Sequence, residues 1–264
     1  MPIDYGMLQD QLRVFLLVFV RMTAMVVAAP VLGSALLRVA PQLVVAIGSA
    51  LSLVVMMNLP APLSAPDYGW ELALRACGEA FLGISIGFLA TLIMAGLQFG
   101  GEVIDHLIGF AVSDVIDPIT NESASLIGNL KGLLATTLFL ALHGHHHLFR
   151  GIMRTFELVP PGGAGLPLEV WPLMETYAEA LFVVGLQVAT PCLLVMTLLW
   201  IPEGFLARMV PQLNLLVNDI PLRIGLGLFL VWLGIGPFVY LVGRLIDSIA
   251  AASDQLALVV AGAT

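Results

Sequence analysis

The sequence has 264 residues, of which 59% are hydrophobic and only 11% charged, and its mean hydropathy is +1.02. This balance excludes an ordinary soluble domain, in which about a quarter of the residues are charged. A formal net charge of -8, with Lys131 as the single lysine, also excludes a surface built to bind nucleic acid. A polytopic membrane protein remains.

In chain order, the sequence has six apolar runs long enough to cross a bilayer as helices. They lie near residues 12–29, 36–59, 73–97, 124–142, 177–200 and 222–246. Proline and glycine mark the connections between the runs. Pro191 and the Gly234–Pro237 segment also interrupt the last two runs, so we predict an all-α membrane protein in which several helices are broken.

Ionisable residues lie within the apolar runs, among them Arg21 in the first, Glu79 early in the third and Lys131 early in the fourth. A charge at such a depth is costly and usually faces protein or water. One interpretation is a path for ions or protons, and the other is ion pairs between helices or subunits. The scattered spacing contains no relay pattern and favours ion pairs.

The third run also carries two small-residue ladders, Gly83-x-x-x-Gly87 and Gly96-x-x-x-Gly100. Glycines one turn apart let two helix backbones approach closely. We therefore expect this helix to pack tightly against another helix, either in the same chain or in a neighbour.

The tract His143-Gly-His145-His146-His147 resembles a metal site at first sight. Its spacing places no pair of histidines beside a carboxylate as in H-E-x-x-H, and cysteine ligands are missing nearby. Phosphate-binding loops and nucleophile motifs are also missing from the sequence. We therefore expect no metal, no cofactor and no enzymatic activity.

The stretch from Gln98 to Pro118 lies between two apolar runs and carries four carboxylates, Glu102, Asp105, Asp114 and Asp117. Lipid cannot satisfy carboxylates or irregular backbone. The stretch is therefore expected to be buried in protein or to line an aqueous cavity. A solvated loop at the membrane interface is the alternative.

Five motifs, taken in order over nearly the whole chain, closely resemble the FliR proteins of the flagellar type III export apparatus. They are Arg21-x6-Ala-Ala-Pro30-Val-Leu, Gly101-Glu-Val-Ile-x3-Ile-Gly-Phe110 continuing to Asp117-Pro118, Phe139-Leu-x3-Gly144-His145, Thr155-Phe156-x-x-x-Pro160-x-Gly162 and Arg208-Met-x-Pro-Gln-Leu213. Each motif alone is unspecific, and their order and spacing carry the resemblance.

The resemblance implies a subunit of the export gate in the bacterial inner membrane, at the flagellar basal body. In that family several P-type and Q-type subunits surround one R-type subunit, and contact with the B-type switch subunit is also implied. Their helices form hairpins that wind into a larger helical assembly, in contact with membrane lipid, around a channel for unfolded export substrates. The chain would be one domain over residues 1–264, with a P-like first part (about 1–200) and a Q-like hairpin (about 177–250).

The resemblance also implies a loop that plugs the channel, at Ile108, Gly109, Phe110 and Ala111. Glycine mixed with apolar residues suits a seal that is dry when closed and can move aside. The segment from Arg208 to Leu213 is expected to form a tight or re-entrant connection. The residues expected to pack helices or subunits together are Arg21, Glu79, Gly83, Gly87, Glu102, Asp117, Lys131, Arg208, Pro211 and Gln212.

Other functions stay open at this point. Flagellar members often have Gly before x-Pro-Leu in the last loop, whereas this chain has Asp219-Ile-Pro221-Leu. A homologous subunit of a virulence injectisome is therefore the first alternative. A secondary transporter should show two halves with matched helix breaks, which the sequence lacks. A purely structural membrane scaffold would tolerate replacement of the Gly109-Phe110 loop.

Overall fold

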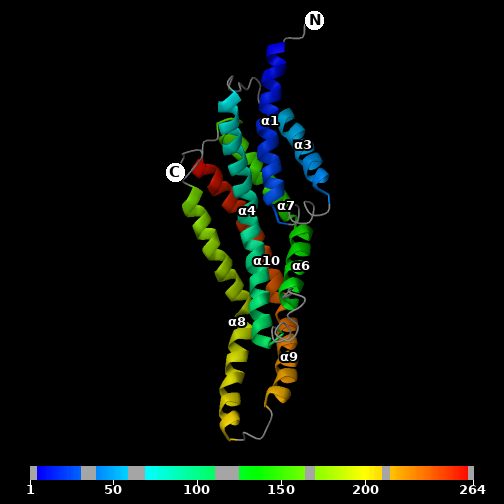
Figure 1. The fold of residues 1–264 in the computed structure, drawn as a ribbon, viewed down its shortest axis with the longest axis vertical. Coiled ribbons are helices and arrows are strands. Elements are labelled where there is room, and N and C mark those ends of the chain that lie inside the picture. The colour runs from blue at the N-terminus through cyan, green and yellow to red at the C-terminus, as the bar shows by residue number, and fades with distance from the viewer. Residues whose placement is uncertain are drawn as a thin grey trace. The chain divides into compact units, whose positions relative to one another are not determined.

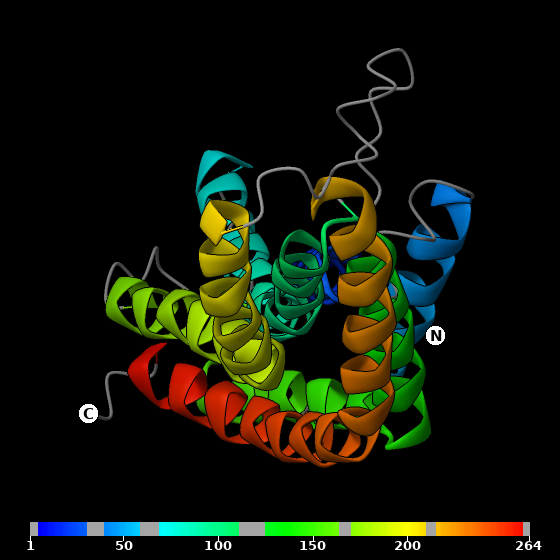
Figure 2. The same ribbon diagram turned by 90° about the horizontal axis from the view of Figure 1, so that it is seen from below.

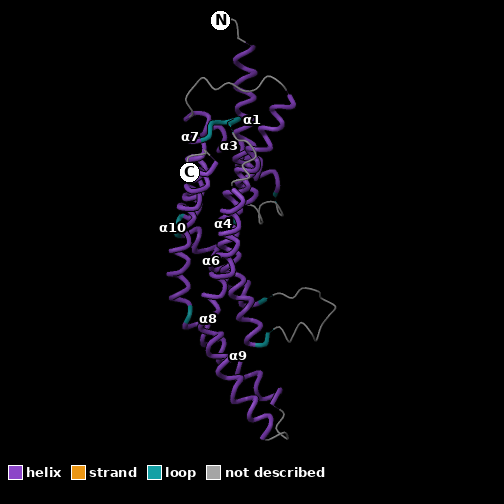
Figure 3. The backbone as a smooth tube through the Cα atoms, turned by 90° about the vertical axis from the view of Figure 1, so that its left-hand side faces the viewer, coloured by secondary structure: helices purple, strands orange, loops and turns teal. Residues whose placement is uncertain are grey.

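A computed structural model describes residues 5–30, 40–58, 69–110, 125–163, 170–209 and 215–260. Within these ranges the secondary structure consists of α-helices, without strands (Figure 3). This confirms the predicted all-α class. The helices are α1 (Tyr5–Ala28), α3 (Pro41–Asn58), α4 (Gly69–Ile108), α6 (Leu126–Ala141), α7 (Gly144–Leu158), α8 (Trp171–Met209), α9 (Leu215–Leu233) and α10 (Ile235–Val260).

Five of these helices contain segments long and apolar enough to cross a membrane. These segments are Gln9–Ala28, Pro41–Asn58, Gly69–Ile108, Trp171–Leu206 and Ile235–Val260. Helices α6 and α7 meet at an angle of 64° and could together form a sixth span. The bend falls at His143, whose φ of 59° lies in the left-handed region. The protein is therefore a multi-pass membrane protein with one bent span among its candidates.

The chain forms two compact units. Unit 1 comprises residues 1–92, 142–177 and 246–264, and unit 2 comprises residues 93–141 and 178–245. Helices α4, α8 and α10 each contribute one part to each unit. The division into a P-like first part and a Q-like hairpin stays a prediction.

Unit 1 is built on α1, which packs beside α3 (Figure 1) and against the first half of α4. A Cβ atom added at Gly83 would lie 2.2 Å from the backbone oxygen of Arg21, and one at Gly87 would lie 2.7 Å from that of Met25. Only glycine allows backbones this close. The first glycine ladder therefore packs against α1 of the same chain.

Unit 2 is built on the second half of α4, which lies between α8 and α9 (Figure 2). The second ladder packs on α8: a Cβ atom at Gly96 would lie 2.8 Å from the oxygen of Leu181, and one at Gly100 would lie 2.7 Å from that of Gly185. Gly101 packs against α6, where its added Cβ atom would lie 2.7 Å from the Cα atom of Gly128. Glycine thus sets the helix spacing in both units.

The positions of the helix breaks differ in part from the prediction. The break at Gly234 is real and separates α9 from α10. The break expected at Pro191 is wrong, because α8 continues through both Pro191 and Pro202, although Figure 1 shows that it bends. A proline removes one hydrogen bond and bends a helix, but neighbouring groups can hold the helix together.

The end of the third apolar run and the role of the histidine tract also differ from the prediction. Helix α4 extends through the predicted end of its run to Ile108, so the first half of the Gln98–Pro118 stretch is helical. The histidine tract, expected to end a membrane run, instead begins the separate helix α7. Leu148, Ile152 and Phe156 form the buried face of α7, at i, i+4 and i+8.

Candidate functional site

Arg21 and Glu79 form a buried ion pair between α1 and α4 in unit 1. Both side chains are fully shielded from solvent. The arginine Nη1 atom also donates to the Thr155 hydroxyl at 3.2 Å, and Nη2 donates to the Val159 carbonyl at 3.2 Å. The guanidinium carbon lies 4.1 Å from the centroid of the Phe156 ring. The charge of Arg21 is therefore compensated within this unit.

The turn after α7 completes this network. The second carboxylate oxygen of Glu79 accepts a hydrogen bond from the Gly162 N–H at 2.7 Å, and Arg75 donates to the Gly162 carbonyl at 2.6 Å. Gly162 has a φ of 83°, a conformation that strains residues with a Cβ atom. The ion pair thus fixes α7 and its following turn onto α1 and α4.

Asp105, in the last turn of α4, contacts both the end of α4 and the beginning of α6 in unit 2. Its carboxylate accepts hydrogen bonds from the Ser125 hydroxyl and from the backbone N–H of Ile127, the latter at 2.9 Å. Its backbone carbonyl accepts from Gly109 at 3.0 Å and from Phe110 at 3.2 Å. Asp105 is only 3% exposed. One buried residue therefore caps the end of α4 and the beginning of α6.

Gly109 ends α4 in a conformation that favours glycine. Its φ is 94°, and a Cβ atom placed there would meet nothing within 4 Å. Such a residue is a common helix stop. Ile108, one position earlier, is fully buried and packs against Gly227 of α9, where an added Cβ atom would lie 2.3 Å from it. Helix α4 therefore ends at a well-defined position.

Glu102 lies at the crossing of α4 and α6. It accepts a hydrogen bond from the Gln98 amide at 3.2 Å, and its Cγ atom lies 2.8 Å from the Cβ position of Gly128. Its backbone carbonyl is 2.8 Å from the Nδ1 atom of His106. Glu102 therefore contacts the same part of α6 as the Asp105 cap.

The sequence profile of "Bacterial export proteins, family 1" matches residues 12–249. The flagellar biosynthetic protein FliR of Bacillus subtilis (strain 168) is 30% identical over 230 residues, which cover 84% of this chain and 86% of that protein. This chain belongs to the FliR family. FliR of Escherichia coli (strain K12) is 26% identical over 212 residues, or 80% of each chain. The secretion system apparatus protein SsaT of Salmonella typhimurium is 25% identical over 158 residues, or 60% of each.

Two of the motifs that resemble FliR meet in the Arg21 network. Arg21 begins the first motif, and Thr155, Phe156 and Gly162 belong to the fourth. Thr155 and Phe156 contact Arg21, and Gly162 contacts its partner Glu79. The FliR-like spacing in this part of the chain therefore corresponds to one buried network that holds unit 1 together.

The predicted site residues fall in separate places. Arg21, Glu79, Gly83 and Gly87 gather in unit 1, whereas Ile108, Gly109, Phe110, Glu102 and Lys131 belong to unit 2. Arg208 is exposed in the last turn of α8. Ala111, Asp117, Pro211 and Gln212 lie outside the described residues, as does most of the predicted Arg208–Leu213 connection.

Sequence reasoning missed Asp105 and Ser125 as the residues that close the loop base. In the sequence, Asp105 is only one of the four carboxylates between Gln98 and Pro118. A serine directly before an apolar helix is a common N-cap signal, and it stands before Leu126. That signal predicts the start of α6 at Leu126, but it does not identify Asp105 as the side chain that accepts hydrogen bonds there.

The histidine tract brings its rings together at the start of α7. The His145 and His146 ring centroids are 4.4 Å apart, and those of His143 and His146 are 5.3 Å apart. Within the described ranges, no three His, Cys, Asp or Glu side chains come together in a group that could hold a metal ion.

Proposed function

We propose that this protein is a core membrane subunit of the bacterial flagellar type III protein export apparatus. In this role it helps to form and to plug the channel through which unfolded flagellar proteins leave the cell. It would lie in the inner membrane at the flagellar basal body, assembled with P-type and Q-type subunits and in contact with the B-type subunit.

The observation that carries this proposal is the match to FliR proteins, which covers most of this chain and most of each FliR protein. The helices support it, because they are long, apolar and joined by glycine-mediated contacts suited to a packed membrane assembly. The similarity to SsaT supports an injectisome role as the second candidate, over a shorter part of the chain.

Deletion of the gene in its native host distinguishes a flagellar role from an injectisome role. A flagellar role predicts loss of filaments and of exported flagellar proteins, both restored by the wild-type gene. Co-expression with the host's own flagellar P-type and Q-type subunits should also yield a stable complex. Normal filaments in the deletion strain, with loss of a virulence secretion system instead, would favour the injectisome role.

The plug is tested at Phe110, which follows the helix stop at Gly109 and is half-buried. A channel seal depends on close apolar contact, so Phe110→Ala should open a leak of small ions while complex yield stays within about twofold. Conductance of the purified complex in a planar bilayer measures the leak. The control is Phe88→Ala, which removes an exposed phenylalanine from α4, the helix that ends two residues before Phe110.

An unchanged conductance together with reduced yield of the Phe110→Ala complex would make Phe110 a packing residue. Gly109→Asp also alters the backbone, because a residue with a Cβ atom is strained at a φ of 94°. Gly109→Asp is nevertheless expected to block export, and Gly109→Asn gives the neutral comparison at the same backbone conformation.

A further inference from the structure

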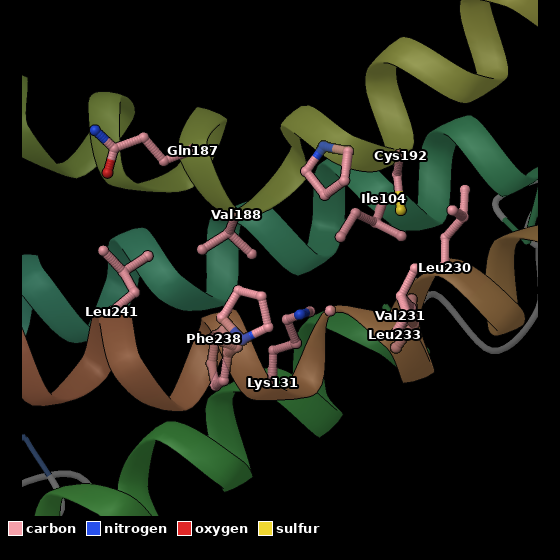
Figure 4. Close-up of a pocket in the computed structure, with 13 residues that line it drawn as sticks. Ile104, Lys131, Gln187, Val188, Cys192, Leu230, Val231, Leu233, Phe238 and Leu241 are labelled. Carbon is pink, nitrogen blue, oxygen red and sulfur yellow. The ribbon is translucent and has the colours of Figure 1, made fainter.

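Unit 2 contains a cavity of about 240 Å³ between α4, α6, α8, α9 and α10 (Figure 4). Its walls are mainly apolar and include Ile104, Val188, Leu230, Val231, Phe238 and Leu241. The break between α9 and α10 forms one side, through Gly234 and Pro237. An apolar cavity at a helix break is a place where a neighbouring side chain can enter.

Lys131 lines this cavity and is only 5% exposed. Its Nζ atom lies 4.4 Å from the centroid of the Phe238 ring (Figure 4). Among the residues that the structure describes, none accepts a hydrogen bond from this ammonium group and no carboxylate forms an ion pair with it. A ring face compensates a buried cation only partly, so the site lacks an anion.

We propose that this cavity receives an acidic side chain carried by an apolar helix of a neighbouring subunit, which pairs with Lys131. The inference rests on the proposed function, because it requires an assembly of membrane subunits. The positive charge of Lys131 favours a carboxylate as its partner, and the apolar cavity walls favour an apolar helix to carry that carboxylate.

The size of the cavity favours one side chain over a lipid or a free small molecule. Sites for such ligands usually measure about 300–1,000 Å³, whereas this cavity has about 240 Å³. Exposed apolar residues of α8 and α9 are also suited to contact a helix: Leu233 lines the cavity, and it, Leu194 and Trp232 are each at least 60% exposed. An acidic residue in an apolar helix would bury its charge in the cavity and its neighbours against these residues.

Lys131→Met is the deciding substitution, because it keeps the length of the side chain and removes its charge. In co-expression with the P-type and Q-type subunits, we expect complex yield to fall at least tenfold. The same substitution should leave the melting temperature of the isolated chain in detergent unchanged or raise it, since it removes an uncompensated charge. A substitution that merely damages the fold would lower both quantities.

Two further variants test the chemistry. Lys131→Arg keeps a cation and should retain complex yield within about threefold. Lys131→Glu should abolish assembly, and changing one acidic residue in an apolar segment of a partner to lysine should restore it. Gln187→Met is the matched control, because Gln187 lines the same cavity without charge and is exposed.

Wild-type yield with Lys131→Met would overturn the inference while leaving the proposed function intact. Failure of the wild-type chain to assemble with either subunit would instead contradict the proposed function itself. Native mass spectrometry of the isolated chain tests the other possible occupant of the cavity, a bound lipid. An anionic phospholipid bound to the wild-type chain, lost in Lys131→Met while assembly is unchanged, would assign the cavity to lipid and exclude a partner.

Discussion

Arg21 and Lys131 are both buried cations in apolar helices, but they are compensated in different ways. Arg21, in unit 1, meets a carboxylate, a hydroxyl, a carbonyl and an aromatic ring of the same unit. Lys131, in unit 2, meets the Phe238 ring and an apolar cavity. The two residues are almost equally shielded from solvent, so exposure alone does not distinguish them.

The two buried cations therefore have different roles: Arg21 stabilises the folded chain, and Lys131 is available for contact with another subunit. A buried charge whose partners belong to the same unit stabilises that unit, and losing one partner leaves the other uncompensated. A buried charge whose counter-charge is missing from the described residues destabilises the isolated chain, and a partner subunit can supply the missing anion. Unit 1 is therefore expected to be self-sufficient around Arg21, and unit 2 to depend on neighbours around Lys131.

The largest effect is expected from Glu79→Leu, which leaves Arg21 buried without a counter-charge. Removing one member of a buried ion pair costs about 3–5 kcal/mol, and the Gly162 N–H also loses its acceptor. The free energy of unfolding of the purified complex, followed by protease resistance in denaturant, measures this loss. The double variant Arg21→Met with Glu79→Leu should recover a large part of it.

The exposed pair Arg154 and Glu157 provides the control for that experiment, because its side chains are 57% and 69% exposed. Glu157→Leu should cost less than about 1 kcal/mol. If Glu79→Leu costs as little as Glu157→Leu, or if the double variant is simply additive, the Arg21 network does not hold unit 1 together.

The sequence predicted those features that depend on local composition. The first, second, third and fifth apolar runs coincide with candidate membrane-spanning helices, whereas the sixth straddles the break between α9 and α10. Glycines one turn apart identify where α4 packs, because this signal needs only the helical period. Helix α7 was not predicted, because histidines and arginines surround its periodic apolar residues Leu148, Ile152 and Phe156 and leave no continuous apolar run.

Other features depend on contacts between residues far apart in the chain. Arg21 and Glu79 are 58 positions apart, so ion pairing could be predicted as a type but the two partners could not be named. Asp105 caps a helix that begins some 20 residues later, which no spacing rule anticipates. The continuity of α8 through Pro191 depends on packing that can outweigh one lost hydrogen bond.

A smaller effect should follow from Cys192→Asp, which would make Lys131 resemble Arg21. Cys192 is buried and lines the same cavity as Lys131. The introduced carboxylate should make the isolated chain about 1.5–3 kcal/mol more stable than Cys192→Asn, because hydrogen bonds to charged groups contribute that much. The melting temperature in detergent and the unfolding free energy measure the difference.

The same substitution should reduce assembly, because Lys131 would no longer need an anion from a neighbour. Complex yield of Cys192→Asp should fall several-fold below that of Cys192→Asn, which has the same shape without the charge. Equal yields of the two variants would mean that the charge of Lys131 is not what the partner recognises, and would weaken the comparison with Arg21.

The smallest effect is expected at Asp105, a buried carboxylate whose partners are neutral donors instead of a cation. Asp105→Asn keeps one acceptor oxygen but turns an N–H group toward Ser125 or the first N–H groups of α6. Since Asn and Asp are similar helix caps, we expect a loss of only about 1 kcal/mol, against about 2 kcal/mol for Asp105→Ala. The unfolding free energy of the purified complex is the measurement, with the exposed Asp247→Asn as control.

This small loss should nevertheless have a specific consequence, because Asp105 contacts described residues on both sides of 111–124. If the segment's base must be fixed for the channel to close, Asp105→Ala should raise ion conductance of the assembled complex while Asp247→Asn leaves it unchanged. The Glu79→Leu variant, despite its larger cost in stability, should produce no such leak in the complexes that still assemble. A leak from Glu79→Leu and none from Asp105→Ala would reverse the roles given to the two units.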